Sequence, residues 1–341
     1  MTAITAQLGL RGLLPGLSIV VLVAVTARVV HGLIGGPSEI LLAIGIGIGV
    51  ASLVRLPPVA APGVAFAAQR ILRVGIVLLG ARLSLGAIAE IGAPVAIAAV
   101  GLVGVILVLG WLVGRRIGLS SPLVGLIAVG TAICGNSAIL ATAPLVRASP
   151  REVSFAVATI TLFGTLALVT YPIIGRALGL DDGAYGTWIG LAVNDTSQVV
   201  GAGAAYSPEA RDVATVVKLI RNLMIAPVVV GIALVAARAD PAGQTGTLRR
   251  GVVRALPLFV IGFLGMALLR TLGVIDATLA DRLAEAAAAC VLVALAAVGL
   301  GTRVGELRAI GPRPMLLGIV LGAVLAVIAA AAIAAFGLGG A

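Results

Sequence analysis

Long apolar segments, separated by short polar or charged stretches, run through the whole chain. About eleven of them are long enough to cross a lipid bilayer as helices. They lie at residues 13–33, 37–54, 70–86, 91–114, 121–146, 152–179, 183–205, 209–237, 252–272, 277–301 and 314–337. Residues 56–69 are apolar but broken by prolines, which predicts a re-entrant turn or a short surface helix. The pattern predicts an all-α membrane protein with about 11 transmembrane helices in one polytopic domain over residues 1–341.

Composition agrees with this pattern. Of the 341 residues, 61% are hydrophobic and 11% are charged, which is far more apolar than a soluble domain requires. Glycine is abundant, with 46 residues, whereas aromatic residues make up only 3%. Small residues allow membrane helices to approach one another closely, so the glycines favour tight helix packing.

The net charge of +10 raises the question of nucleic-acid binding, but the arginines are spread over short loops and form no basic stripe with stacking aromatics. We therefore expect no nucleic-acid partner. If all eleven segments cross, one side of the membrane carries about twice as many arginines as the other. The excess of positive charge predicts a cytoplasmic N-terminus and a C-terminus outside.

Two distant segments resemble each other. Val74 to Pro94 and Ala294 to Pro314 share a Gly-x-Arg pattern followed by Ile-Gly. They belong to the third and tenth predicted spans. Because these spans are seven apart, an odd number, they cross the membrane in opposite directions. This predicts an inverted repeat, as in many secondary transporters.

Serine-proline pairs mark predicted helix starts. Ser149 and Ser207 are each followed by proline, and Glu152 completes a capping box with Ser149. We assign no chemistry to Glu152 or Glu209.

A first polar stretch, Cys134-Gly135-Asn136-Ser137, interrupts the segment at 121–146. Glycine, asparagine and serine favour ending one helix and starting another. A helix broken at this depth presents free N–H groups that suit an anion. The alternative is a continuous helix in which Asn136 and Ser137 bond to a neighbouring helix.

A second polar stretch, Asn194-Asp195-Thr196-Ser197-Gln198, lies in the middle of the segment at 183–205. An aspartate costs about 2.5–3.5 kcal/mol at the centre of a membrane helix, so Asp195 must pair, bind a cation or hold a proton. The alternative to a functional role is that Asp195 forms a purely structural ion pair. Asn194, Thr196, Ser197 and Gln198 are candidates to line a solute path.

Lys218 and Arg221 lie three residues apart in an apolar segment and so share one helix face. Lys218 is the only lysine of the chain. Both side chains either snorkel to the membrane surface, or lie at depth. In the second case one of them pairs with Asp195, or both attract an anion.

Several enzyme chemistries are unsupported. His31 is the only histidine, so neither a catalytic triad nor a histidine metal site is expected. Cys134 has no base nearby in the sequence, and no nucleotide-binding motif is present. We expect no enzyme activity, no metal site and no cofactor beyond a coupling proton or sodium ion.

Taken in order, five motifs of the chain resemble the YeiH-like sulfate exporter family of bacterial inner-membrane proteins. The motifs are LRVGIVLLGARLSL (72–85), GTAICGNSAI (130–139), TLFGTLALVTYP (161–172), GLAVNDTSQVVGAG (190–203) and VVKLIRNLMIAP (216–227). Many members have His-Glu where this chain has Asn194-Asp195, so a mechanism that needs that histidine does not apply. The family is also distantly similar to the sodium/proton antiporter and bile-acid symporter group, which implies inverted repeats and crossing, interrupted helices.

The resemblance implies a secondary active transporter in the bacterial plasma membrane. We expect it to carry a small inorganic or organic anion, sulfate or an organosulfonate, with Asp195 as the ion-coupling residue. Gly135, Asn136, Ser137, Asn194, Thr196, Ser197, Gln198, Lys218 and Arg221 are the predicted substrate-binding residues. Alternatives are a cation/proton antiporter, in which Lys218 competes for Asp195, and a non-transporting membrane sensor or enzyme. Partners are the solute and the lipid bilayer, and a homodimer is left open.

Overall fold

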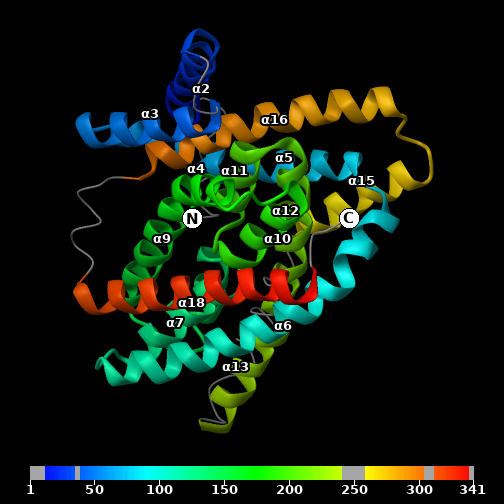
Figure 1. The fold of residues 1–341 in the computed structure, drawn as a ribbon. Helices are drawn as coiled ribbons and strands as arrows, with labels where there is room; N and C mark the ends of the chain where they lie inside the picture. The colour runs from blue at the N-terminus through cyan, green and yellow to red at the C-terminus, as the bar shows by residue number, and fades with distance from the viewer. Residues whose placement is uncertain (1–11, 35–38, 240–257, 303–310, 338–341) are drawn as a thin grey trace. The chain divides into compact units, whose positions relative to one another are not determined.

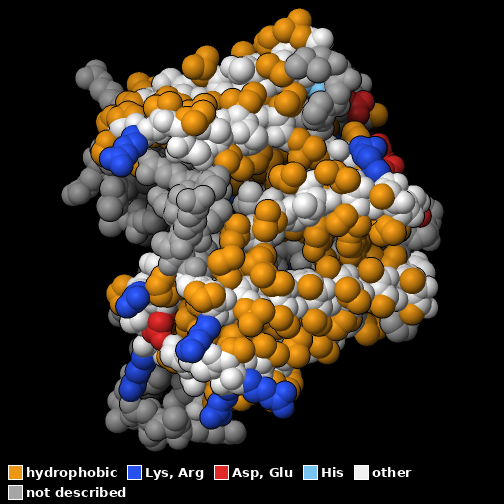
Figure 2. All heavy atoms as spheres, turned by 60° about the vertical axis from the view of Figure 1, so that its left-hand side comes forward, with side chains coloured by type: hydrophobic (Ala, Val, Ile, Leu, Met, Phe, Trp, Pro, Cys, Tyr) orange, Lys and Arg blue, Asp and Glu red, His pale blue; other side chains and the backbone are white. Residues whose placement is uncertain are grey.

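The computed structural model describes residues 12–34, 39–239, 258–302 and 311–337 (Figure 1). The described residues form helices and no strands. Seven of these helices are long and apolar enough to cross a membrane. Hydrophobic side chains cover much of the face shown in Figure 2, with small groups of basic side chains between them. These findings support a multi-pass membrane protein.

The chain divides into two compact units. Unit 1 comprises residues 1–87 and 259–306, and unit 2 comprises residues 88–258 and 307–341.

Unit 1 is built around helix α16 (Ala277–Leu300), which packs against α2 (Leu14–Ile34), α3 (Glu39–Leu53) and α5 (Leu72–Leu79). Glycines permit this packing: a Cβ on Gly47 of α3 would lie 2.8 Å from the carbonyl oxygen of Ala296. The shorter helix α15 (Leu258–Thr271) completes the unit.

The proline-rich residues 56–69 differ from expectation. They are part of a nearly continuous helical run, Pro58–Arg82, that is long enough to span a membrane. This run contains η2 (Pro58–Ala60), α4 (Ala61–Phe66), η3 (Ala67–Ile71), α5 and η4 (Gly80–Arg82). Pro58 and Pro62 both lie in the first turns of their helices, where a missing N–H costs little, so the helix starts earlier than predicted.

Unit 2 contains nine helices in its described residues, and every predicted site residue lies in these helices or in the breaks between them. They are α6 (Leu85–Arg116), α7 (Ser121–Ala132), α8 (Asn136–Thr142), α9 (Pro150–Ala177), α10 (Asp182–Ala192), α11 (Thr196–Tyr206), α12 (Pro208–Leu223), α13 (Ile225–Ala239) and α18 (Pro312–Phe336). Helix α6 begins in the last residues of unit 1.

Helices α7 and α8 form a hairpin, which we call hairpin 1, and do not form one span. Gly130 of α7 faces Ile139 of α8, because a Cβ on Gly130 would lie 2.9 Å from Ile139 Cδ1. Ser120, just before α7, donates a hydrogen bond to Glu152 at the start of α9. The two ends of the hairpin therefore lie together at the N-terminal end of α9, and the expected crossing at 121–146 is replaced by a turn back.

Helices α10 and α11 form a second such hairpin, hairpin 2. Ser207, which follows α11, donates to Asp182 Oδ1 at the start of α10 over 2.6 Å. Further in, the Tyr185 hydroxyl donates to the carbonyl oxygen of Ala202. The expected crossing at 183–205 is thus also a hairpin, and the crossing helices implied by the family resemblance are absent from these two segments.

The two hairpins open at opposite ends of α9. Hairpin 1 is tied to the N-terminal end through Ser120, and Arg176 at the C-terminal end donates to the Tyr206 carbonyl oxygen of hairpin 2 over 2.9 Å. With 28 residues, α9 is about 42 Å long. The predicted capping box of Ser149 and Glu152 is confirmed at its start.

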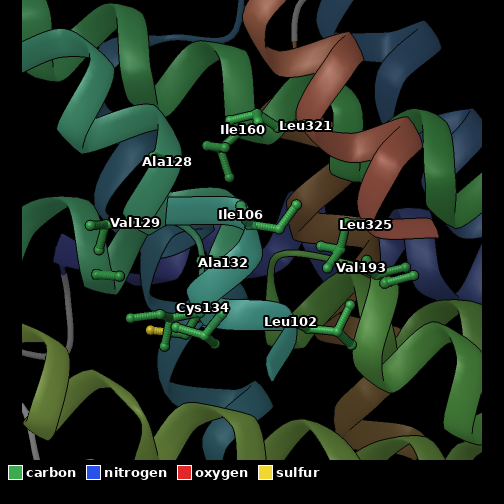
Figure 3. Close-up of a cluster of buried hydrophobic side chains, with 14 of the residues drawn as sticks. Leu102, Ile106, Ala128, Val129, Ala132, Cys134, Ile160, Val193, Leu321 and Leu325 are labelled. Carbon is green, nitrogen blue, oxygen red and sulfur yellow. The ribbon is translucent and has the colours of Figure 1, made fainter. Parts of the chain in front are cut away.

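The remaining helices support both hairpins. Helix α12 runs beside α10, with Val213 and Val217 against Gly186 and Gly190. Continued by α13, it forms the long apolar stretch Pro208–Val235. A hydrophobic core packs around hairpin 1, and Figure 3 shows Leu102, Ile106 and Ile160 from α6 and α9 directed into it, with Leu321 and Leu325 from α18.

The sequence repeat is not confirmed. Its second copy, residues 294–314, includes positions 303–310, which lie outside the described residues.

Candidate functional site at the hairpin tips

The tip of hairpin 1 is a true helix break. Helix α7 ends before Ile133, which has φ −119° and ψ −93°, and Gly135 has φ +64°. A side chain at Gly135 would be strained at this angle, which explains the glycine. The broken-helix prediction is confirmed here, and the continuous-helix alternative is wrong.

The tip of hairpin 2 is a second helix break, at Val193-Asn194-Asp195, which coincides with the second polar stretch. Asp195 is the N-cap of α11, and its Oδ1 accepts from the backbone N–H of Ser197 at 2.8 Å and from the Ser197 hydroxyl at 2.5 Å. Capping by a carboxylate satisfies a free N–H and suits the positive end of the helix dipole.

The two tips meet beside the middle of α9. A Cβ on Gly135 would lie 3.4 Å from Asp195 Oδ2. Thr161 of α9 joins the hairpins, because its hydroxyl accepts from Asn136 Nδ2 at 3.4 Å and its carbonyl oxygen accepts from Gln198 Nε2 at 3.3 Å. Residues from both polar stretches therefore lie together in unit 2 and form one candidate site.

Lys218 is fully buried between the two tips. Its Nζ donates to the carbonyl oxygens of Ile133 and Val193, both at 2.8 Å, and so ties the end of α7 to the end of α10. These carbonyls belong to helix ends, which lack partners within the helix and carry the negative end of the dipole. Lys218 does not snorkel.

Arg221 is also fully buried and binds the same two helix ends. It donates to the carbonyl oxygens of Thr131 and Ala132 in hairpin 1, and of Leu191 and Val193 in hairpin 2. The two cations thus satisfy five backbone carbonyls. In the described part of the chain, neither forms an ion pair with Asp195. The predicted direct pairing is therefore not observed.

Unpartnered groups at the site are oxygens. Among buried side-chain atoms, Asn136 Oδ1, Asn194 Oδ1, Gln198 Oε1 and Asn222 Oδ1 make no hydrogen bond. The amide nitrogen of Asn222 donates to the Thr196 hydroxyl at 3.2 Å. Buried acceptors without a partner are costly, so such groups usually mark a water or ligand position.

Exposure divides the predicted residues into two sets. Ser137 is exposed, and Asn136, Asp195 and Thr196 are half-buried. Asn194, Ser197 and Gln198 are buried. In the described ranges, no three histidine, cysteine, aspartate or glutamate side chains gather as a metal site would require.

Two residues of the site received no role from the sequence. Thr161 bonds both hairpins, and Gly164 leaves room for Gln198, since a Cβ on Gly164 would lie 1.7 Å from Gln198 Oε1. Both belong to the motif at 161–172, but threonine and glycine are too common in membrane helices to stand out alone.

Comparison with known proteins agrees with the family resemblance. A family model described as Conserved hypothetical protein 698 matches residues 11–318. The UPF0324 membrane protein TauZ of Paracoccus pantotrophus is 37% identical over 317 residues, covering 90% of this chain and 92% of TauZ.

Other relatives carry the same family name. A UPF0324 membrane protein of Bordetella bronchiseptica is 37% identical over 262 residues, covering 76% of this chain and 81% of its own length. A UPF0324 membrane protein of Nitratidesulfovibrio vulgaris is 33% identical, covering 87% and 84%. No solved structure matches the chain. The chain belongs to the UPF0324 family of membrane proteins, consistent with its YeiH-like motifs.

Proposed function

We propose that this protein is a secondary active transporter of a small anion, sulfate or an organosulfonate, coupled to a proton or sodium ion. The observation that carries the proposal is the pair of buried cations, Lys218 and Arg221, that joins two helix-hairpin tips. A lysine or arginine at the centre of a membrane helix costs about 2.5–3.5 kcal/mol on insertion scales, so such residues are typical of solute and ion pathways.

The residues at the two hairpin tips have different roles in this proposal. Lys218 and Arg221 hold the helix ends and supply positive potential, which favours a nearby anion. Gly135, Asn136 and Ser137, at the less buried tip, contact the anion, and Asn194, Thr196, Ser197 and Gln198 line the path. Asp195 carries the coupling ion, because its Oδ2 lies at the meeting point of the tips.

The transport proposal includes an inverted repeat, which we place within unit 2. Hairpin 1 with α9, and hairpin 2 with α12 and α13, follow the same order of elements but open at opposite ends of α9. Repeats of opposite orientation allow a site at their interface to open alternately to either side.

The distribution of exposed arginines supports one orientation of unit 2 in the membrane. The hairpin 1 end of α9 carries the exposed arginines Arg115, Arg116, Arg147, Arg151 and Arg313. At the other end, Arg176 is exposed, whereas Arg211 pairs with Asp212. The positive-inside rule assigns the hairpin 1 end to the cytoplasm, and with it a C-terminus of α18 on the outside.

The test is flux in proteoliposomes under imposed pH or sodium gradients, with sulfate and alkanesulfonates as solutes. We expect gradient-driven flux in the wild type and its loss in Asp195→Asn, which preserves the size of the side chain and its contact with Ser197. Normal gradient coupling in the variant would contradict the role of Asp195.

A cation/proton antiporter is the second candidate, favoured by the absence of an ion pair at Asp195 among the described residues. It predicts cation-dependent proton flux without any anion. That result, with no anion flux, would replace the first proposal.

A further inference from the structure

An apolar pocket of about 560 Å³ lies beside hairpin 1 in unit 2. Helices α7 and α8 of the hairpin form one wall, and α6 and α13 contribute the others, with Leu107 and Ile232 among the lining residues (Figure 1). The volume falls in the range of about 300–1,000 Å³ that is typical of small-molecule sites. In the buried part of the pocket, Thr142 is the only lining residue with a polar side chain. A single hydroxyl cannot replace the hydration of an ionic solute, so the pocket suits an apolar ligand.

The pocket runs from the base of hairpin 1, where α7 begins, toward the tip. Ala128 and Val129, which line it nearer the tip, are buried, whereas Trp111 and Val235, which line it nearer the base, are exposed. Along α7, the lining extends from Pro122 to Val129, a rise of about 11 Å. A bilayer core about 30 Å thick leaves about 15 Å for the chains of each leaflet. The pocket therefore has the length and direction of much of one lipid acyl chain, with its open end at the base.

Positive charge lies at this open end. The guanidinium of Arg115 lies over the ring of Trp111, 5.0 Å from its centroid, and is held there by a cation–π interaction. Arg115 is exposed and forms no ion pair with a carboxylate in the part of the chain that the structure describes. Arg147, also exposed, directly follows the wall residue Val146. Because an arginine can bind a phosphate group through two parallel hydrogen bonds, the open end is complementary to an anionic headgroup.

We propose that this pocket binds one acyl chain of an anionic phospholipid, whose headgroup lies on Arg115 at the base of hairpin 1. Water does not fill an apolar cavity of this kind, and lipid chains are the apolar molecules that surround the protein in a membrane. A zwitterionic lipid offers the same chain without net charge, and so binds more weakly. Because α7 and α8 form one wall, the bound chain packs against hairpin 1 and stabilises it.

Native mass spectrometry of the whole protein, delipidated in detergent, counts the bound lipids. We expect dioleoylphosphatidylglycerol to form a one-to-one complex about tenfold tighter than dioleoylphosphatidylcholine, and to raise the melting temperature saturably. Glycerol 3-phosphate, which has the phosphate but no acyl chain, should do neither. Equal binding of the two lipids, or equal stabilisation by glycerol 3-phosphate, would overturn the proposal. A dimer that binds no lipid would also overturn it, because a second copy would then cover the pocket.

Two variants fill the pocket from different walls. Gly125 of α7 and Gly231 of α13 both line it, and a Cβ at either position meets nothing within 4 Å. Gly125→Phe and Gly231→Phe should each abolish the selective complex. Gly101→Phe on α6, where a Cβ is equally free but lies outside the pocket lining, is the matched control and should bind normally. Selective binding that persists in both filled variants would place the lipid elsewhere and overturn the proposal.

A further pair of variants tests the headgroup. Arg115→Gln removes the charge at the open end and should reduce the preference for phosphatidylglycerol over phosphatidylcholine about fivefold or more, while the chain still binds. Arg116→Gln removes the same charge one residue along the exposed end of α6 and should keep most of the preference, because Arg115 is the residue that stacks on Trp111. An equal loss in the two variants would mean that binding depends on net charge alone, which would overturn the site at Arg115.

Discussion

Lys218 and Arg221 donate to the same backbone atom, the carbonyl oxygen of Val193, at 2.8 and 3.0 Å. Val193 is the C-cap of α10 and the first residue of the break in hairpin 2, and each cation also reaches the end of α7 in hairpin 1. One helix, α12, thus joins two hairpins that start from opposite ends of α9. The helix breaks are stable in an apolar environment because their carbonyls are satisfied by these two side chains.

Loss of Lys218 should separate the tips. Lys218→Met leaves the Ile133 carbonyl without its donor, and an unsatisfied buried group costs about 1–3 kcal/mol. We expect a lower melting temperature in detergent and loss of flux. Arg116→Gln, at an exposed helix end, is the control and should change stability by about 0.5 kcal/mol or less. Equal melting of Lys218→Met and the wild type would show that the cation does not hold the tips.

Gly164 should not tolerate a methyl group. In Gly164→Ala the new Cβ would lie 1.7 Å from Gln198 Oε1, so Gln198 must move and lose its bond to Thr161. Overpacking of this kind costs about 1–3 kcal/mol. The comparison is Gly125→Ala in α7, where the Cβ meets nothing within 4 Å and alanine favours the helix. Thermal melts should show destabilisation in the first variant alone, and similar melts would refute the close contact.

The hairpin structure predicts from which side of the membrane introduced cysteines react. With Cys134 and Cys290 replaced by alanine, Arg116→Cys and Arg151→Cys should react with an impermeant thiol reagent from the same side of the membrane. Leu178→Cys, at the far end of α9, should react from the opposite side. Labelling of positions 116 and 151 from opposite sides would mean that residues 121–146 cross the membrane as one span.

The break at Gly135 could be predicted from the sequence, because glycine, asparagine and serine end and start helices within an apolar segment. The polar residues Asn194-Asp195 marked the position of the second break but did not predict it. The sequence does not predict that each of these segments turns back on itself as a hairpin. Residues 121–146 are as long as a membrane span, and the contact that closes this hairpin joins Ser120 to Glu152, far apart in the sequence. Hydrophobic length alone does not distinguish a crossing from a return.

The buried cations were also only partly predictable. Their spacing placed Lys218 and Arg221 on one face of α12, but a sequence shows side chains and not the free carbonyls of broken helices. Asp195 was therefore the apparent partner, whereas the actual partners are backbone atoms such as the Val193 oxygen. Thr161 and Gly164 are residue types too common in membrane helices to indicate their place between the tips.

The central claim, that the solute passes the hairpin tips, is tested most directly at Ser137. This residue is exposed at the tip of hairpin 1. In a background without native cysteines, a charged thiol reagent on Ser137→Cys should stop flux of the transported anion in proteoliposomes, and excess solute should slow the modification. The same reagent on Ser121→Cys, at the base of the hairpin, should leave flux intact. Full flux through protein completely modified at position 137 would contradict the account.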